Sequence, residues 1–553
     1  MRRTSSRLLL LAMATALIAT ACGTDDTGTQ AGETETAMDT ESPTGGETGA
    51  RVEGGTVVFG ADQEPAIMNP ILTEGNLFAN GLIATAVLQG AYTITPDFQY
   101  VPQLLEGEAE VVSEDPFTVE WKIHPDATWA DGTPVTSADF AFTNSVINDE
   151  SLDIVSRSGH ELITEEEEVD DKTYRATFSE PFAPYRTIFS PVLPAHDLEG
   201  QDLSTYWNDT ITLGSGPYQV DTWQKGQQLT LTKNADFWGE TKPSIDEIVI
   251  RFIEDSQSQV QALRGGEIDM FYPQPQPELV QQVDEIDGVT FEVSDGPVYE
   301  HLDLNFGNPA LALDHVRKAI AHGIDRQAIV DQLIVPMKED ASVLNNVMFM
   351  SNQDQYEPHW DQYDYNPETA TALHEDNGGT MGDNSIYTCD GNELSFGFVF
   401  TAGNEARQLQ FEIIQAQLAE IGIDMQDESG EAATVFGEVL VSSEWDAFAF
   451  AWVGNPDPVG NVEIFKCDGS QNFQNYCNEE VTSLLEQTNS TIDQQQRFAL
   501  FNEADALMAD DMPLLPLYQK PSMLAWNNKI QGPKDNTTTV GPFWNIEEWY
   551  LTE

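Results

Sequence analysis

The sequence predicts an α/β protein built from more than one structural unit. At 553 residues the chain is too long for a single hydrophobic core. Strand patterns and helix patterns alternate from about residue 55 to the C-terminal end, which favours mixed α/β units with a sheet covered on both faces. A hydrophobic content of 40% and an aromatic content of 10% are typical of a packed globular protein rather than a disordered one.

Strands are predicted where apolar residues alternate or form short continuous runs. In 117–123, the large apolar residues fall on every second position, which is typical of a half-buried strand. Segment 445–453 is apolar and aromatic throughout, and Gly454, Pro456 and Pro458 end it in a turn. Further strands are predicted at 56–60, 174–178, 228–234 and 247–254.

Three long helices are predicted in the second half of the chain. Segment 314–334 has an apolar stripe and Asp314 as its expected N-cap. Segment 404–423 begins at Asn404 and has Gly422 where a helix C-cap belongs. Segment 494–518 is expected to be a helix stopped by Pro513. We interpret these stripes as core-facing and assign them no chemistry.

The charge of the chain excludes several partners. With 93 acidic and 24 basic residues the net charge is −69, which repels nucleic-acid phosphates and gives no basic patch for anionic lipids. Two explanations of the acidity stay open. It is either a general surface property suited to salty or acidic surroundings, or a means of steering cationic ligands.

The N-terminus is typical of an exported protein. Basic residues precede the apolar run 8–19, and small residues lead to Cys22, so 1–21 is predicted to be a signal peptide. A Cys directly after such a site resembles the lipobox of bacterial lipoproteins, in which that Cys is lipidated. The alternative is an ordinary secretory signal with an incidental Cys. Residues 22–53 are acidic and poor in large apolar groups, which predicts a disordered tether. No later segment is apolar for the ~18 residues that a membrane-spanning helix needs.

The remaining cysteines predict one disulfide. Cys467 and Cys477 flank a short polar loop, and in an exported protein such a pair is expected to be oxidised. Closing this loop is worth about 2–3 kcal/mol. Cys389 is then left as a free thiol. A zinc site is disfavoured because no His or second Cys pair lies nearby in the sequence.

Signatures of catalysis are absent from the sequence. It contains no HExxH, no GxSxG, no phosphate-binding loop and no EF-hand spacing. His315 and His322 lie on a core-forming helix and are interpreted as structural or surface groups. We therefore expect no catalytic residue, no metal and no cofactor, and rank an enzyme last among the hypotheses.

Five segments in order resemble one family. They contain the sequences TWADGTPVTSADFAFT, LGSGPYQVDTW, an L-x-x-GE-x-D element, LDLNFGNPALALDHVRKAIAHGIDRQAIV and ADDMPLLPLYQ. Read together, they resemble the extracellular solute-binding proteins of ABC importers, in the peptide- and oligopeptide-binding class known as family 5. The resemblance covers about residues 55 to 553. The segments are 128–143, 213–223, 232–270, 302–330 and 509–519.

The resemblance implies a two-lobed, periplasmic-binding-protein-like fold with a ligand cleft between the lobes. It also implies a hinge where the chain crosses between lobes, near 303–306 and 515–525. The expected division is a discontinuous first lobe (54–100, 210–303 and 520–553), an inserted subdomain of that lobe (101–209) and a second lobe (304–519).

The implied function is capture of peptides by hinge closure and their delivery to a membrane permease with its ATPase subunits. Together with the leader, this places a lipid-anchored monomer at the outer face of the cytoplasmic membrane, or in the periplasm if an outer membrane is present. One alternative is the same role for an oligosaccharide, an opine-like compound or a metal chelate. Another is a ligand-sensing surface protein without transport.

The resemblance also indicates binding residues. In peptide binders a W-x-x-D segment lies in the cleft and its Asp pairs with the amino terminus of the ligand. Here that segment begins at Trp452 and has Asn455 in place of the Asp, so Asp457 is the candidate for that role; alternatively, 454–458 is only a turn that ends a strand. Arg407 is either a partner for a ligand carboxylate or part of a solvated helix face. The other candidate ligand-binding residues are Thr73, Glu74, Gly214, Ser215, Asn305, Asn472 and Phe473.

Overall fold

The structure is a computed structural model that describes residues 50–553, apart from the side chain of Ala433. The predicted signal peptide, Cys22 and most of the predicted tether lie outside the described residues. None of the helices in residues 50–553 has the length and apolar character needed to cross a membrane.

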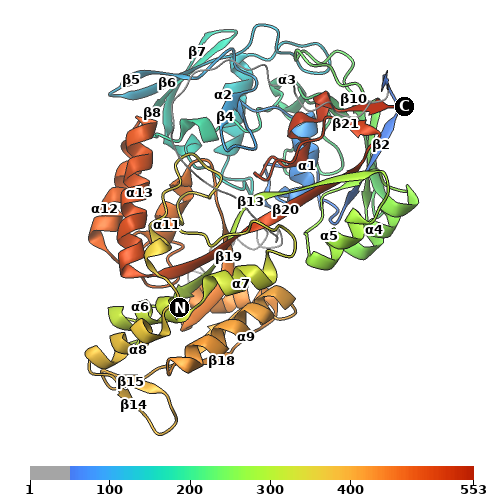
Figure 1. The fold of residues 1–553 in the computed structure, drawn as a ribbon. Helices are drawn as coiled ribbons and strands as arrows, with labels where there is room; N and C mark the ends of the chain where they lie inside the picture. The colour runs from blue at the N-terminus through green and yellow to red at the C-terminus, as the bar shows by residue number, and fades with distance from the viewer. Residues whose placement is uncertain (1–49) are drawn as a thin grey trace, which may run out of the picture.

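One ten-stranded sheet runs through the molecule. Its strand order is β18 (Asp424–Asp427), β17 (Ser395–Val399), β19 (Ala447–Val453), β13 (Val289–Leu304), β20 (Leu514–Asn527), β12 (Met270–Phe271), β2 (Thr56–Ala61), β11 (Glu247–Phe252), β10 (Gln228–Lys233) and β9 (Tyr218–Gln224). The two central strands are the longest, and Figure 1 shows them side by side, running between the body that holds α1 and β2 and the body that holds α6 to α9.

These two strands divide the protein into lobes. We call the part from β12 to β9 with its helices the first lobe, and the part from β19 to β18 with its helices the second lobe. One half of β13 pairs only with β20, and its other half also pairs with β19, so each central strand belongs to both lobes. The fold is therefore two-lobed and α/β, as the sequence predicts.

Four smaller sheets complete the strands. The largest has the order β5 (Glu110–Glu114), β6 (Phe117–Lys122), β8 (Thr173–Phe178) and β7 (Ile163–Asp170), and we call it, with α2, the four-stranded subdomain. The other sheets are β1 (Arg51–Val52), β22 (Tyr550–Thr552) and β21 (Ile530–Gln531); β14 (Thr380–Met381), β15 (Tyr387–Cys389) and β16 (Asn392–Glu393); and β3 (Tyr92–Ile94) with β4 (Tyr100–Pro102).

Helices cover the sheets in three groups. Those of the first lobe are α1 (Phe78–Val87), α4 (Ser256–Gly265) and α5 (Pro277–Asp284), and those beside the four-stranded subdomain are α2 (Ser137–Ile147) and α3 (Ala195–Leu198). Those of the second lobe are α6 (Asp314–Gly323), α7 (Arg326–Leu333), α8 (Pro367–Asp376), α9 (Glu405–Glu420), α10 (Ala432–Thr434), α11 (Val462–Phe465), α12 (Glu479–Ser490) and α13 (Gln494–Asp511).

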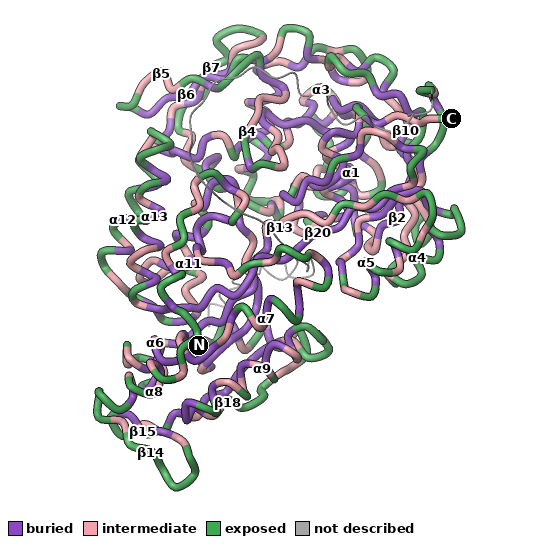
Figure 2. Tube along the Cα trace, viewed as in Figure 1, coloured by how far each residue is buried: buried purple, intermediate pink, exposed green. Residues whose placement is uncertain are grey.

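Three large hydrophobic clusters correspond to this layout. One fills the second lobe and continues across the central strands to α4 and α5, one fills the rest of the first lobe, and one fills the four-stranded subdomain. Figure 2 shows buried residues along the main sheet, whereas the loop that carries β14 is largely exposed.

The predicted strands are confirmed, with one difference in burial. The predicted segment 117–123 becomes β6, but it is buried on both faces rather than on one. Glu120 on its second face is only 8% exposed, and it is tolerated there because Arg175 and Lys122 pair with its carboxylate. The predicted tether also ends earlier than residue 53, since Arg51–Val52 pair with β22.

Two of the predicted helices have different bounds. Segment 314–334 is two helices, α6 and α7, because the chain leaves the helical conformation at Ile324 and Asp325 caps a new helix by accepting a hydrogen bond from the Ala328 amide. Asp314 lies in the first turn of α6 and is not its N-cap, so that prediction was wrong. Segment 494–518 is helical from Gln494 to Asp511 and stops just before Pro513, as predicted, whereas its last residues, from Leu514, begin β20.

A buried ion triad fastens the central strands to the second lobe. Glu300 on β13 is fully buried and pairs with Arg407 on α9 at 2.6 Å and with Lys520 on β20. Burial raises the pKa of Glu300, but Arg407 and Lys520 outweigh burial and lower this pKa to about 2. The carboxylate is therefore charged in the folded protein at every pH above that value.

We expect Glu300→Gln to lower the free energy of unfolding by about 3–5 kcal/mol at pH 7, because it leaves two buried cations without their counter-charge. Since folding lowers the pKa of Glu300 from 4.5 to about 2, its contribution is complete above pH 4.5 and is lost as the pH falls through about 2. Urea unfolding of both proteins between pH 7 and pH 3 measures this difference, which should shrink with acidity.

A matched control is Glu267→Gln. Glu267 also pairs with an arginine, Arg251, but its side chain is 66% exposed, so the free energy of unfolding should change by less than about 0.5 kcal/mol. A difference between Glu300→Gln and the parent that does not vary with pH would contradict the assignment.

Candidate ligand-binding cleft

The opening between the lobes contains a cavity of about 530 Å³. The second lobe contributes the loop after β19 to its wall, and the first lobe contributes α1, the β3–β4 hairpin and the segment around Arg186 to Pro191. Its lining residues are Pro70, Gly81, Ala84, Thr85, Leu88, Gly90, Tyr92, Thr93, Ile94, Tyr100, Gln103, Arg186, Thr187, Ser190, Pro191, Asn455, Asp457, Val459, Gly460, Thr539 and Val540.

The loop after β19 is placed by close backbone packing. Gly454 donates a hydrogen bond from its amide to the carbonyl of Pro297 at 2.6 Å, next to the middle of β13. A Cβ at Gly454 would lie 2.8 Å from Cγ of Met350, so a larger residue would push the loop away. The loop then turns into a short 3-10 helix, Pro458–Asn461, and presents Asn455 and Asp457 to the cavity.

Asp457 is a buried carboxylate with one oxygen to spare. The residue is 5% exposed, and its Oδ2 pairs with Arg497, which lies in the first helical turn of α13 and is 3% exposed. Its Oδ1 has no hydrogen-bond partner within the described residues. Burial raises the pKa of Asp457, and this rise is opposed by Arg497, by a hydrogen bond from the Val459 backbone amide and by the charge of Arg186. Asp457 lines the cavity, and this oxygen is itself buried.

Asn455 gives the cavity a neutral amide. Its Nδ2 donates to the carbonyl of Val453 at 3.3 Å, and its own backbone carbonyl accepts a hydrogen bond from Gln353 at 3.2 Å. These contacts fix the loop, and the amide supplies no charge for an ammonium group.

Four other predicted residues, Thr73, Glu74, Gly214 and Ser215, do not line the cavity. Ser215 accepts a hydrogen bond from the amide of Gln89 at 3.1 Å, and a Cβ at Gly214 would lie 2.0 Å from the carbonyl oxygen of Val87. Gly214 and Ser215 therefore hold the end of α1, where Leu88 and Gly90 line the cavity. Thr73 and Glu74 belong to the 3-10 helix Thr73–Gly75, and Thr73 Oγ1 donates to the carbonyl of Asp153 at 3.2 Å.

The predicted residues of the second lobe, except the loop after β19, make internal contacts. Trp452 stacks on His301 with ring centroids 6.3 Å apart. The side chain of Asn305 donates to the carbonyl of Ser443 at 2.9 Å. Asn472 donates to the carbonyls of Lys466 and Tyr476, and Phe473 packs on the small apolar cluster around Phe448 and Phe450.

Arg407 is not on a solvated helix face, so that interpretation was wrong. The residue is 3% exposed, and its guanidinium donates to Glu300 and to Thr401. The pattern of its helix did not reveal this, because the partner lies on β13, more than a hundred residues earlier.

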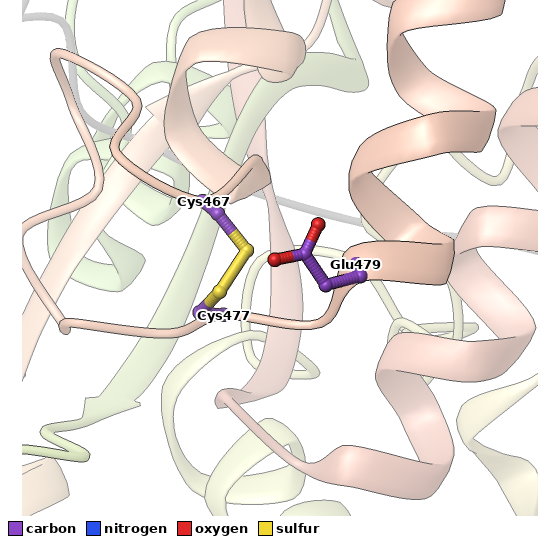
Figure 3. A group of neighbouring side chains, drawn as sticks. All are labelled: Cys467, Cys477 and Glu479. Carbon is purple, nitrogen blue, oxygen red and sulfur yellow. A yellow bond between two sulfur atoms is a disulfide. The ribbon is translucent and has the colours of Figure 1, made fainter.

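The predicted disulfide between Cys467 and Cys477 is confirmed. Figure 3 shows the carboxylate of Glu479 beside the two sulfur atoms. Among residues 50–553 these three side chains form the one group close enough to hold a metal ion, but the sulfurs are bonded to each other and are not thiolates. Cys389 is buried and free, as expected.

The structure brings Arg186 and Tyr100 to the cavity, which the sequence analysis missed. Arg186 donates from Nε to Glu108 at 2.8 Å, and its charge acts on Asp457 and Tyr100 across the cavity. Neither residue lies in a recognisable motif. The only signal in the sequence is the scarcity of basic residues, 24 against 93 acidic ones.

Comparisons with known proteins agree with this architecture. Residues 99–473, more than half of the chain, match the family described as bacterial extracellular solute-binding proteins, family 5 Middle. The oligopeptide-binding protein OppA of Mycobacterium tuberculosis is 28% identical over 484 residues, which cover 86% of this chain and 81% of that protein.

Solved structures show the same fold. The periplasmic EDTA-binding protein EppA superposes with a TM-score of 0.83 at 26% identity, covering 93% of this chain and 100% of that chain. The oligopeptide-binding protein AppA of Bacillus subtilis, in complex with a nonapeptide, superposes with a TM-score of 0.71 at 22% identity, covering 91% of this chain and 100% of that chain. With two lobes, a cavity between them and this match, the chain belongs to family 5 of the bacterial extracellular solute-binding proteins, the binding components of ABC importers.

Proposed function

We propose that this protein captures short peptides in the cavity between its lobes and delivers them to a membrane permease and its ATPase. One observation carries the proposal: a buried carboxylate, Asp457, lines a cavity between the two lobes, and its Oδ1 has no hydrogen-bond partner among residues 50–553. A buried acceptor without a partner is costly, and a ligand donor would remove that cost.

The size and walls of the cavity support a small solute. A volume of about 530 Å³ falls within the range typical of small-molecule sites, about 300–1,000 Å³. Apolar groups such as Leu88, Ile94 and Val540 alternate with hydroxyl groups along its walls. Such a surface buries apolar side chains of a solute while a few polar groups fix its orientation.

Asp457 supplies the charge that Asn455 lacks. An ammonium group at Oδ1 would form a charge-assisted hydrogen bond in a site shielded from water. Oδ2 is already paired with Arg497, so the ammonium group would lie beside an ion pair and not beside an isolated carboxylate. Asn455 then serves as a neutral donor or acceptor for a neighbouring amide of the solute.

Hinge closure would bring the two walls together. The pairing of β13 with β20 is interrupted after Asp295 and resumes at Tyr299, midway between the lobes. A Cβ at Gly296 would lie 2.3 Å from the carbonyl oxygen of Lys520, so the two strands are in close contact at the interruption. We infer that the hinge includes this interruption, a few residues before the crossing near 303–306 that the family resemblance implies, and that the inserted subdomain stays at 101–209.

The turn between α12 and α13 would act as the closure contact. Ala183, next to the four-stranded subdomain, donates a backbone hydrogen bond to the carbonyl of Asn489 at 3.0 Å. Ile492 of the same turn packs on the hydrophobic cluster of that subdomain. Figure 1 shows this helix pair reaching from the second lobe to β8. Ala183 is three residues before Arg186, which lines the cavity. Ile492 is five residues before Arg497, the partner of Asp457.

Membrane attachment would come from the leader. Lipid on Cys22 and the acidic tether would hold the folded body at the outer face of the cytoplasmic membrane, as a monomer facing its permease. Cys22 and most of the tether lie outside the described residues, and both features rest on the sequence pattern alone.

A metal chelate is the second candidate solute. Two observations favour it: an amide replaces the expected carboxylate at Asn455, and an arginine, Arg186, lines the cavity. A polycarboxylate chelate would suit such a cavity. The similarity to EppA, whose name describes an EDTA-binding protein, points the same way.

We expect Asp457→Asn to weaken binding of the dipeptide Ala-Ala about 10- to 100-fold, because a charge-assisted hydrogen bond is lost. Binding of N-acetyl-Ala-Ala should be weak in both proteins, since it has no ammonium group. Isothermal titration calorimetry with both peptides measures the ratio of the Ala-Ala affinity to the N-acetyl-Ala-Ala affinity. A folding defect would weaken binding of both peptides and would not change this ratio.

Because Asp457→Asn leaves Arg497 buried without a partner, the double variant Asp457→Asn/Arg497→Gln serves as the second test. Equal effects on the free and the acetylated peptide would contradict an amine-binding role. Asn455→Asp is the matched control: it should strengthen binding of Ala-Ala and weaken binding of Fe(III)-EDTA, because it adds a negative charge to the cavity.

We expect Ile492→Asp to weaken Ala-Ala binding about 10-fold, because closure would then bury a charge against the subdomain. Small-angle X-ray scattering should show that the ligand-induced decrease in the radius of gyration is reduced. Val441→Asp is the control, since Val441 is in the second lobe and 43% exposed. Unchanged affinity and compaction in Ile492→Asp would show that the turn plays no part in closure.

A further inference from the structure

Among residues 50–553, the charged residues that line the cavity are one acid and one base. Asp457 comes from the second lobe and Arg186 from the segment that follows the four-stranded subdomain. The acid already has a partner in Arg497. In a chain with a net charge of −69, most charged residues are acidic, so a basic residue at the cavity wall is an exception. Arg186 therefore needs an explanation of its own.

Arg186 is held in place through one side of its guanidinium. Its Nε donates to Oε2 of Glu108 at 2.8 Å, and the same oxygen accepts a hydrogen bond from the hydroxyl of Tyr92 at 3.2 Å. The guanidinium carbon lies 5.0 Å from the centroid of the Tyr185 ring. Glu108 and Tyr185 thus restrict the orientation of the guanidinium directly, and Tyr92 fixes Glu108, which lowers the entropy cost of binding an anion.

The terminal nitrogens of Arg186 are left for a solute. Among residues 50–553, Nη1 and Nη2 of Arg186 have no hydrogen-bond partner, while its side chain is 25% exposed. These two nitrogens form the planar fork that matches a carboxylate with two parallel hydrogen bonds. Glu108 does not remove this capacity, because it uses only Nε and its own side chain is 51% exposed to water, which screens its charge.

We propose that Arg186 determines specificity by binding a carboxylate of the solute through Nη1 and Nη2. The inference deepens the proposed function and rests on it: the same solute would place an ammonium at Asp457 and a carboxylate at Arg186. A short peptide with free termini carries both groups. A carboxylate chelate shares the second group and would use Arg186 without needing Asp457.

The ion pair between Arg186 and Glu108 contributes too little to stability to explain the presence of Arg186. Both side chains are partly exposed, and pairs of that kind contribute about 0–1 kcal/mol to stability. Arg186→Gln should therefore fold like the parent protein, and its effect should be confined to binding.

The experiment measures binding of three probes to the purified protein by equilibrium dialysis. The probes are the dipeptide Ala-Ala, its C-terminal amide, and Fe(III)-EDTA. The parent protein should bind Ala-Ala at least 10-fold more tightly than the amide. Arg186→Gln should weaken Ala-Ala binding about 10- to 100-fold and abolish the preference over the amide. Arg186→Lys should retain only part of the preference for Ala-Ala over its amide, because a lysine ammonium lacks the two parallel N–H donors of a guanidinium.

Arg264→Gln is the matched control. It changes the net charge by the same amount at an exposed position on α4, so all three affinities should be unchanged. Equal binding of Ala-Ala and its amide by the parent, or a preference that survives in Arg186→Gln, would overturn the role of Arg186 and leave peptide capture intact.

The outcomes also separate the two sources of a carboxylate. If the parent protein binds Fe(III)-EDTA but neither peptide, and Arg186→Gln loses that binding, the role of Arg186 stands and peptide capture fails. If none of the probes binds, the proposed solute classes and the role of Arg186 fail together.

Discussion

The antiparallel pairing of β13 with β20 is the constraint on which the rest of the structure depends. β13 carries the second-lobe half of the main sheet on its outer side, and β20 carries the first-lobe half. The pairing of these two strands therefore sets how the lobes are placed relative to each other. The cavity exists because the loop after β19 is tied to Pro297, at the interruption of the same pairing. Glu300 anchors the second-lobe end through Arg407 and Lys520. A buried triad of this kind costs desolvation of three charges, and it is stable only while all three are present.

Charge in the cavity is arranged differently from charge on the surface. The surface acids are numerous and mostly solvated, which keeps the protein soluble but specifies no ligand. Among the described residues, the cavity has one lining carboxylate, Asp457, which is buried and paired with Arg497, and one lining arginine, Arg186, which is held through Nε. Groups with half of their hydrogen-bonding capacity used are oriented by the protein and still able to bind a solute. The proposed recognition of a zwitterion depends on these two partly used groups, Asp457 for the ammonium and Arg186 for the carboxylate.

Local patterns predicted many of the elements but not their junctions. Segments in which apolar residues fall on every second position, such as 228–234, are strands in the structure. Successive side chains of any strand point to opposite faces, so this pattern can be recognised without knowing the neighbouring elements. The helix predicted over 314–334 is divided at Ile324, where Asp325 caps a second helix, a choice that the apolar stripe does not reveal. The strand β20 was not predicted, and it is unusual for a central strand because it contains Pro516 and Pro521. In the structure each proline lies beside a shift in the pairing of β13 with β20, where the ladder of hydrogen bonds is already interrupted.

The sequence by itself determined the fold class, the family, the disulfide of Cys467 with Cys477, and the loop that presents Asn455 and Asp457. Each of these depends on neighbours in the chain or on ordered motifs. Only the tertiary structure decided which groups face Asp457: Arg497, forty residues later on α13, and Arg186 on the opposite wall. It also decided that Arg407 is buried against Glu300 rather than solvated. The physical reason is that the partner of a charged side chain is set by packing between elements far apart in the chain, and periodicity carries no record of that packing.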